Sequence, residues 1–180
     1  SAGQLSAVDG FFKDAAVKIL MPPQAQNVEK TLRNMGMGKL VDDAILSMNR
    51  AAEDASKSAT PIYVSAVKSM SVQDGLGILR GADTAATGYL RTTTSPQLSA
   101  AFHPVIDSSL QKTGATKYWK TLADAYNKIP FVQKVNPDLG EYTTNKALDG
   151  LFYMVGQEEA KIRKDPAARV TDILKKVFAN

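Results

Sequence analysis

The chain has 180 residues, of which 44% are hydrophobic and 22% are charged. This is the size of one globular domain, and the composition excludes a disordered or fibrous chain. With no cysteine and one histidine, thiolate metal sites, iron–sulfur clusters and cysteine nucleophiles are excluded. The net charge of +4 comes from interleaved cations and acids, a pattern that does not favour nucleic-acid binding. No apolar run is long enough for a transmembrane span.

Helix start signals recur along the chain. Thr60-Pro61, Ser95-Pro96 and Asp165-Pro166 each place a hydrogen-bond acceptor before a proline, which is the pattern of an N-cap followed by the first helical residue. Ser71 and Asp74 have the spacing of a capping box. Strand and hairpin patterns are nearly absent. The glycines expected to end helices are Gly36, Gly38, Gly81 and Gly114.

These signals, together with apolar residues at helical spacing, predict an all-α protein. We expect a compact single-domain bundle of about eight to ten helices over residues 1–180, because neither a repeat nor a linker divides the chain. The expected helices lie near residues 4–19, 23–35, 39–59, 61–70, 72–80, 83–93, 96–112, 115–128, 141–164 and 166–178.

The expected helix 39–59 has many alanines on its apolar arc, so a neighbouring helix is expected to approach it closely. On the opposite arc, Arg50 and Asp54, and likewise Glu53 and Lys57, have the i,i+4 spacing of ion pairs. This arc is therefore interpreted as a solvated face.

A first polar constellation is formed by Asp83, Thr84, Thr87 and Arg91, which share one arc of an expected helix. A carboxylate, two hydroxyls and a guanidinium on one stripe are suited to a small polar ligand or to the loop of a partner protein. The alternative is an ordinary solvated helix face.

Glu158 and Glu159 both fall within the apolar arc of helix 141–164. A buried carboxylate needs a partner, because an unpaired buried charge costs several kcal/mol. We expect an ion-pair clamp that joins the last two helices; the alternatives are a general acid and base, or a site for a hard cation. The candidate partners are Arg50, Arg91, Arg163 and Arg169.

The only histidine lies in a series with the spacing i, i+4, i+8, formed by Ser99, His103 and Asp107. Three side chains on one helix project in parallel and supply no oxyanion hole, so a hydrolase triad is not expected. Gly75-Leu76-Gly77 lacks the spacing and the preceding strand of a dinucleotide site. We expect neither a cofactor nor a metal.

Several longer strings resemble one family. They are Asp9-Gly10-Phe11-Phe12 and the segments 46–53, 81–87, 146–153 and 163–169. Together they make the chain similar to the bacterial family catalogued as domain of unknown function 4197. The resemblance implies a helical protein without an assigned activity, exported to the periplasm or associated with the envelope, and in some members a lipoprotein. It also implies an amphipathic segment before the first string, and a signal segment, that this chain lacks.

The sequence therefore favours a non-enzymatic binding module for an envelope partner or for an apolar, lipid-like ligand. The alternatives are a hydrolase-type enzyme that uses Glu158 and Glu159, and a purely structural envelope scaffold. Leu46, on the polar face of helix 39–59, indicates a second covered surface. The residues expected to form the site are Asn49, Arg50, Glu53, Asp83, Thr84, Thr87, Arg91, Asp149, Tyr153, Glu158, Glu159, Arg163 and Arg169.

Overall fold

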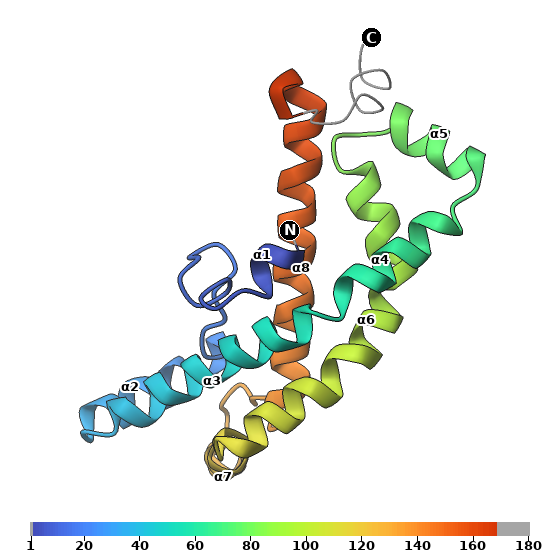
Figure 1. The fold of residues 1–180 in the computed structure, drawn as a ribbon. Helices are drawn as coiled ribbons and strands as arrows, with labels where there is room; N and C mark the ends of the chain where they lie inside the picture. The colour runs from blue at the N-terminus through green and yellow to red at the C-terminus, as the bar shows by residue number, and fades with distance from the viewer. Residues whose placement is uncertain (1, 169–180) are drawn as a thin grey trace.

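The computed structural model describes residues 2–168 and contains no β-strand among them. The all-α prediction is confirmed, with eight α-helices and two short 3-10 turns in the described chain (Figure 1). In chain order these are α1 (Ala2–Leu5), η1 (Pro23–Ala25), α2 (Gln26–Asn34), α3 (Gly38–Ser56), α4 (Ala59–Lys68), α5 (Val72–Arg80), α6 (Ala85–Lys112), α7 (Ala115–Tyr126), α8 (Leu139–Lys164) and η2 (Pro166–Ala168).

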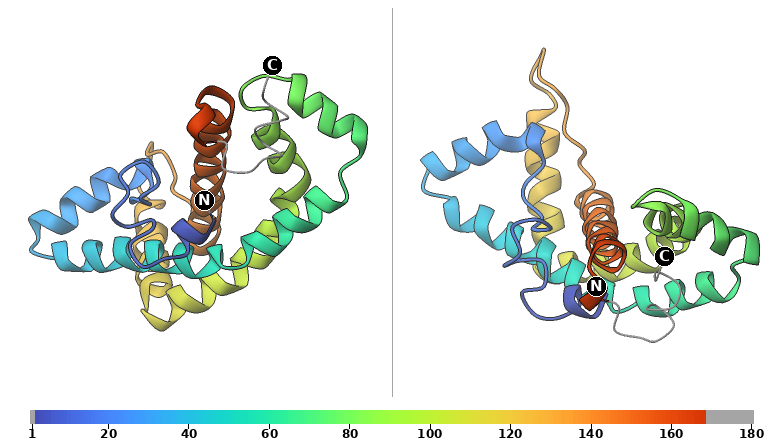
Figure 2. Two further views of the ribbon diagram at one scale, coloured as in Figure 1. Left: turned by 45° about the horizontal axis from the view of Figure 1, so that its top comes forward. Right: turned by 90° about the horizontal axis from the view of Figure 1, so that it is seen from above.

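The long helices α6 and α8 run antiparallel at the centre of the molecule, and α3 lies across both (Figures 1 and 2). The buried side of α6 repeats every four residues, which places those side chains on one face of the helix. Three of the four alanines of α3 are fully buried on its apolar arc, and Ala44 is partly buried; these small side chains let α6 approach closely. The fully buried residues of this interface are Leu98, Phe102, Ile106 and Leu110 of α6 and Met48, Ala51, Ala52 and Ala55 of α3.

Helix α6 is one continuous element, although Ser95-Pro96 predicts a helix start there. Pro96 and Pro104 both lie inside it, so the expectation of two helices, 83–93 and 96–112, is wrong. A proline inside a helix removes one backbone hydrogen bond. The apolar face from Leu98 to Leu110 is buried along its whole length, and this packing keeps the helix continuous past the prolines.

The N-terminal segment departs most from its prediction. In place of a helix over 4–19, α1 ends at Leu5, and the chain continues without an α-helix to residue 25. Asp9 has a φ of 68° in the left-handed region. At Gly10 a Cβ atom would collide with the backbone carbonyl of Leu5 at 2.6 Å. The segment is therefore folded back on α1, in a path that a continuous helix cannot follow.

Other local predictions have mixed outcomes. The capping box of Ser71 and Asp74 is present at the start of α5. Gly36 and Gly114 have the positive φ of helix-ending glycines, whereas Gly81 is extended. Helix α4 begins at Ala59, before the expected cap at Thr60. Most of the expected last helix, 166–178, lies outside the described residues.

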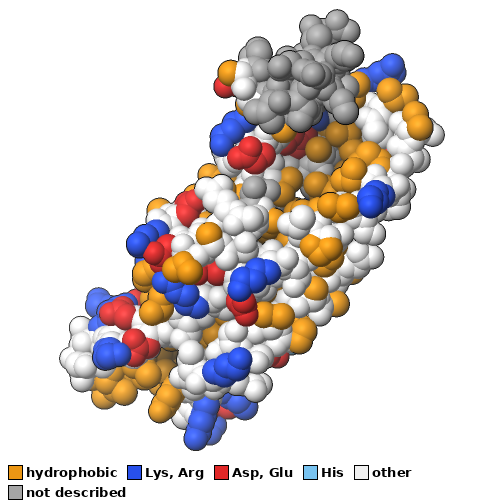
Figure 3. Space-filling view, in the orientation of Figure 1, with side chains coloured by type: hydrophobic (Ala, Val, Ile, Leu, Met, Phe, Trp, Pro, Cys, Tyr) orange, Lys and Arg blue, Asp and Glu red, His pale blue; other side chains and the backbone are white. Residues whose placement is uncertain are grey.

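Helices α4 and α5 form an arm that packs on α6 and leaves several apolar side chains exposed. Helix α5 contains no buried residue. Hydrophobic side chains gather at the upper right of Figure 3, where α5 lies in Figure 1. The exposed apolar residues of the arm are Val64, Val67, Val72 and Leu76. None of the helices within residues 2–168 combines the length and the apolar character needed to cross a membrane.

Gly150 of α8 allows the N-terminal segment to pack directly on this helix. A Cβ atom at Gly150 would lie 2.8 Å from Cε1 of Phe11 and 3.2 Å from Cβ of Val17. Phe11 is fully buried, so its ring has no free space into which to move. The Asp-Gly-Phe-Phe string and the segment 146–153, which both carry the family resemblance, thus meet at this contact.

We expect Gly150→Ala to lower the free energy of unfolding by about 1–3 kcal/mol, because the added methyl group overpacks the core. Urea denaturation measures the change. Gly88→Ala is the matched control, because a Cβ atom at Gly88 meets nothing within 4 Å. This control should leave stability unchanged or raise it by up to about 1 kcal/mol. Equal effects of the two substitutions would contradict the packing argument.

Candidate functional site

A groove of about 880 Å³ runs along one face of α8. One side is formed by residues 16–21 of the N-terminal segment, and the other by the start of α6; these two elements flank α8 (Figure 2). The residues that α8 contributes recur every three or four positions, as expected for a single helix face. They include Tyr142, Lys146, Asp149, Tyr153, Gly156, Ala160 and Lys164.

The structure brings six of the predicted site residues into this groove. They come from α8 and from the stretch that leads into and begins α6. Asp83 and Thr84 precede α6, and Thr87 and Arg91 lie in its first two turns. The six lining residues are Asp83, Thr84, Thr87, Arg91, Asp149 and Tyr153.

Polar contacts connect α6 and α8 across the groove. The carboxylate of Asp83 forms an ion pair with Lys164 at 2.9 Å. Farther along, Arg91 lies 3.4 Å from Asp149, and its guanidinium carbon lies 4.6 Å from the ring centroid of Phe152. About half of the Arg91 side chain is exposed. These contacts fix the cation at the groove surface while leaving it accessible to a ligand.

Glu159 lies beneath this surface and serves the N-terminus of α6. The backbone N–H groups of Ala86 and Thr87 donate to its two oxygens at 2.9 and 2.8 Å, and the Thr87 hydroxyl donates at 2.7 Å. Thr84, at the N-cap position, provides no side-chain cap. Glu159 therefore satisfies from α8 the free N–H groups with which every helix begins.

Arg163 completes this clamp. It contacts Glu159 at 2.8 Å and donates to the carbonyl of Ile78, near the end of α5, at 2.7 Å. Burial raises the pKa of Glu159, but hydrogen bonds from Ala86 and Thr87 and the contact with Arg163 outweigh it, so that the pKa lies below its ordinary value. The carboxylate is consequently ionised at neutral pH.

The prediction that both glutamates are buried is wrong for Glu158. Its side chain is 43% exposed and pairs with Lys161 at 3.2 Å, because the next position on a helix is rotated by about 100°. The clamp made by Glu159 and Arg163 joins α8 to the junction of α5 and α6. Most of the other helix expected in the clamp, 166–178, lies outside the described residues. Neither glutamate lines the groove. Arg169 lies outside the described residues.

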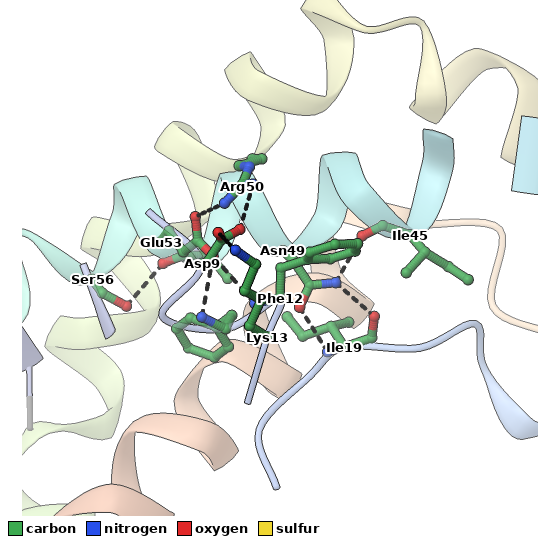
Figure 4. A network of polar contacts seen from close by, with 11 residues as sticks. Asp9, Phe12, Lys13, Ile19, Ile45, Asn49, Arg50, Glu53 and Ser56 are labelled. Atoms are coloured by element: carbon green, nitrogen blue, oxygen red, sulfur yellow. Dashed lines mark hydrogen bonds and ion pairs between the residues drawn. The ribbon is translucent and has the colours of Figure 1, made fainter. Parts of the chain in front are cut away.

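Three further predicted residues, on α3, hold the N-terminal segment (Figure 4). The buried carboxylate of Glu53 accepts the backbone N–H groups of Phe11 and Phe12 at 3.1 and 3.2 Å. Arg50 donates to Glu53 and to Asp9, both at 2.7 Å. Hydrogen bonds from Lys13 and Arg50 hold the pKa of Asp9 below its usual value.

Asn49 binds the same segment closer to the groove. Its Oδ1 accepts the N–H of Ile19 at 2.9 Å, and its Nδ2 donates to the carbonyl of Ile19 at 2.8 Å. Tyr142 donates from α8 to the carbonyl of Leu20 at 2.9 Å, and burial raises its pKa to about 12. Asn49, Arg50 and Glu53 therefore support the groove wall without lining the groove.

The prediction of i,i+4 ion pairs on a solvated face of α3 is wrong. Glu53 pairs with Arg50 and Lys57 pairs with Asp54, each three residues apart. Glu53 faces inward because two backbone N–H groups of the N-terminal segment require an acceptor there. The i,i+4 spacing within α3 does not indicate that backbone N–H groups of a distant segment need a hydrogen-bond acceptor at Glu53.

A second, more apolar hollow of about 370 Å³ lies between α2, α3 and α7. Leu46, the leucine on the polar arc of α3, lines it together with Leu40 and Trp119. The N-terminal segment reaches it through Met21, which lines both hollows.

His103 contacts Asp107 at 3.2 Å and Thr144 at 3.4 Å, between α6 and α8. The contact with Asp107 lies within α6, and the contact with Thr144 adds to the antiparallel pairing of α6 and α8. Within residues 2–168, no three histidine or acidic side chains are grouped so as to hold a metal ion.

The fold and the groove define a class: an all-helical protein in which buried polar side chains anchor a non-helical N-terminal wall beside an open hollow. The chain belongs to the family described as protein of unknown function (DUF4197), whose sequence model matches residues 1–179. Comparison with curated proteins and with solved structures gives no match.

We expect Glu159→Gln to lower the free energy of unfolding by about 2–4 kcal/mol at pH 7, because it removes a buried charge that pairs with Arg163 and turns one oxygen acceptor of the α6 N–H groups into an amide donor. Glu158→Gln is the matched control at the adjacent position and should change stability by less than about 0.5 kcal/mol. Thermal and urea denaturation measure both. Similar losses in the two variants would contradict the assignment.

The contribution of Glu159 to the stability of the fold depends on pH in a direction that follows from its pKa. The pKa of Glu159 is lower in the folded protein than in the unfolded chain, so its stabilisation is fully present above about pH 4.5 and is lost as the pH falls through the folded pKa. The stability difference between wild type and Glu159→Gln should therefore narrow below about pH 4.5. A difference that widens on acidification would show that the carboxylate is not stabilised by these contacts.

We expect Asn49→Ala to release residues 16–21, because the buried N–H and C=O groups of Ile19 lose their partner, at a cost of about 2–4 kcal/mol. Hydrogen–deuterium exchange should accelerate at these residues more than within α6 and α8. Ser47→Ala, on the same helix, should leave exchange unchanged. Uniform acceleration through the whole chain would contradict a local anchoring role.

Proposed function

We propose that this protein is an exported, non-enzymatic binding protein of the bacterial envelope, and that its groove along α8 holds a lipid-like ligand. The groove carries the proposal, because its volume of about 880 Å³ lies in the range of about 300–1,000 Å³ that is usual for ligand sites. The envelope location follows from the family resemblance, since members are usually exported.

The composition of the groove supports an amphipathic ligand. Val17 and Ile19 of the N-terminal wall and Phe152 of α8 line the groove with almost fully buried side chains, and together they are termed its apolar floor. Charged and hydroxyl groups from α6 and α8 lie along the rim. A ligand with an apolar chain and a polar end matches both surfaces, because the chain leaves water while the polar end keeps hydrogen-bond partners.

Two observations favour binding over the alternatives. A purely structural scaffold is expected to have neither a ligand-sized hollow nor converging polar groups. A hydrolase that uses Glu159 as a general acid needs a protonated carboxyl within reach of its substrate. Glu159 is instead ionised, accepts hydrogen bonds on both oxygens and does not line the groove.

Native mass spectrometry of the protein produced in its own host tests the proposal. We expect a bound mass of lipid size that delipidation removes and that is absent from Gly156→Phe, because the new side chain occupies the groove. A Cβ atom at Gly156 makes only ordinary contacts of 3.6 and 3.8 Å with Thr87, so the new side chain starts without a clash, and thermal denaturation checks that the variant folds. Gly88→Phe, on an open face of α6, is the matched control and should retain the bound mass.

A third variant distinguishes the two hollows. Leu46→Trp fills the pocket between α2, α3 and α7 and should also retain the bound mass. Loss of the ligand from this variant, with retention by Gly156→Phe, would place the site in the apolar pocket and overturn the groove assignment. Repeated absence of any bound mass from wild-type protein would overturn the proposed function.

A further inference from the structure

Positive charge is in excess along the groove. Among residues 2–168, its lining contains four cationic side chains and two carboxylates, Asp83 and Asp149. The excess is unevenly distributed. At one end, Lys164 and Asp83 form a one-to-one pair at 2.9 Å, so their charges are mutually neutralised. The four lining cations are Lys18, Arg91, Lys146 and Lys164.

At the other end, one carboxylate is shared between two cations. Asp149 lies 3.4 Å from Arg91 and 3.9 Å from Lys146. Both distances are longer than the 2.7–2.9 Å of a strong charge-assisted hydrogen bond. All three side chains are about half exposed. Asp149 therefore neutralises only part of the local positive charge, and both cations retain free donors for a ligand.

Lys18 adds a third cation from the opposite wall. Its ammonium lies 4.2 Å from the ring centroid of Phe12, and within the described chain no carboxylate forms an ion pair with it. Val17, the preceding residue, packs against the position of Gly150. Lys18 thus lines the groove from the N-terminal wall, one residue away from a contact with the turn of α8 that follows Asp149.

The position of Arg91 over the ring of Phe152 is suited to binding an anion. Its guanidinium lies over the ring of Phe152, which restricts its rotation and lowers the entropy cost of binding. An arginine presents donors in a planar fork that matches the oxygens of a phosphate. The apolar floor formed by Val17, Ile19 and Phe152 belongs to the same groove, so a chain attached to the anion can be buried there.

We propose that Arg91, Lys146 and Lys18 bind the phosphate-monoester headgroup of an amphiphile whose chain lies on the apolar floor. This inference rests on the proposed function and names the ligand class. Three cations and Asp149 leave a net charge of +2, which matches the charge of about −1.5 to −2 on a phosphate monoester at pH 7.

Isothermal titration calorimetry with three probes tests the headgroup, with the two dodecyl amphiphiles kept below their critical micelle concentrations. We expect dodecyl phosphate to bind at least about tenfold more tightly than dodecyl maltoside or inorganic phosphate, and its affinity to fall with added salt because the charges are exposed.

Equal affinity for dodecyl maltoside would overturn the headgroup inference but leave the proposed function intact. Equal affinity for inorganic phosphate would show a free-phosphate site and overturn the amphiphile. Binding of none of the probes would overturn the headgroup inference, whereas the bound mass from the native host decides the proposed function separately.

Two substitutions with opposite expected effects identify the residues. Lys146→Gln should weaken dodecyl phosphate binding by about fivefold, as expected for an exposed ionic contact. Asp149→Asn removes the competing carboxylate and should tighten binding by a similar factor, an effect that structural damage does not produce. Lys120→Gln is the matched control, because Lys120 forms an exposed pair with Asp124 on α7, outside the groove. Weaker binding in Asp149→Asn would overturn the proposed role of the cation cluster.

Discussion

Buried polar side chains that complete the hydrogen bonding of distant backbone hold this structure together. Asn49 and Glu53 bind the N-terminal segment, which has no helical hydrogen bonds of its own at these points. Glu159 does the same for the first N–H groups of α6. Backbone groups that leave water must find partners, or each costs about 1–3 kcal/mol. Three side chains thus determine where one wall of the groove and the start of α6 are placed.

Local signals were sufficient for the fold class and insufficient for two of its elements. The periodicity of α3 and α8 and the capping box at Ser71 depend on residues within a few positions, so the sequence predicts them well. The path of residues 6–22 depends on α3 side chains that lie 30–42 positions away in sequence. The continuity of α6 through Pro96 depends on packing against α3 and α8. No local pattern contains either interaction.

The same distinction explains which site residues were predicted. Asp83, Thr87, Arg91 and Asp149 stand out as polar groups at helical spacing. Lys146 and Lys164 follow the same spacing along α8, although they are not among the predicted site residues. Helical spacing does not identify Lys18 as a site residue, because Lys18 belongs to a segment whose predicted helix does not form. Which of the two adjacent glutamates is buried depends on how α8 is rotated relative to α6, and the sequence of α8 does not contain this information.

The two walls of the groove differ in their mechanics. One consists of the long helices α6 and α8, which are stiffened by their own backbone ladders. The other consists of residues 16–21, attached through the Tyr142 bond to Leu20 and the Asn49 bonds to Ile19. Displacing this wall breaks a few side-chain hydrogen bonds and exposes the buried side chains of Val17, Ile19 and Met21, but it unwinds no helix. The width of the groove is therefore set at these attachment points, independently of the stability of the helical framework.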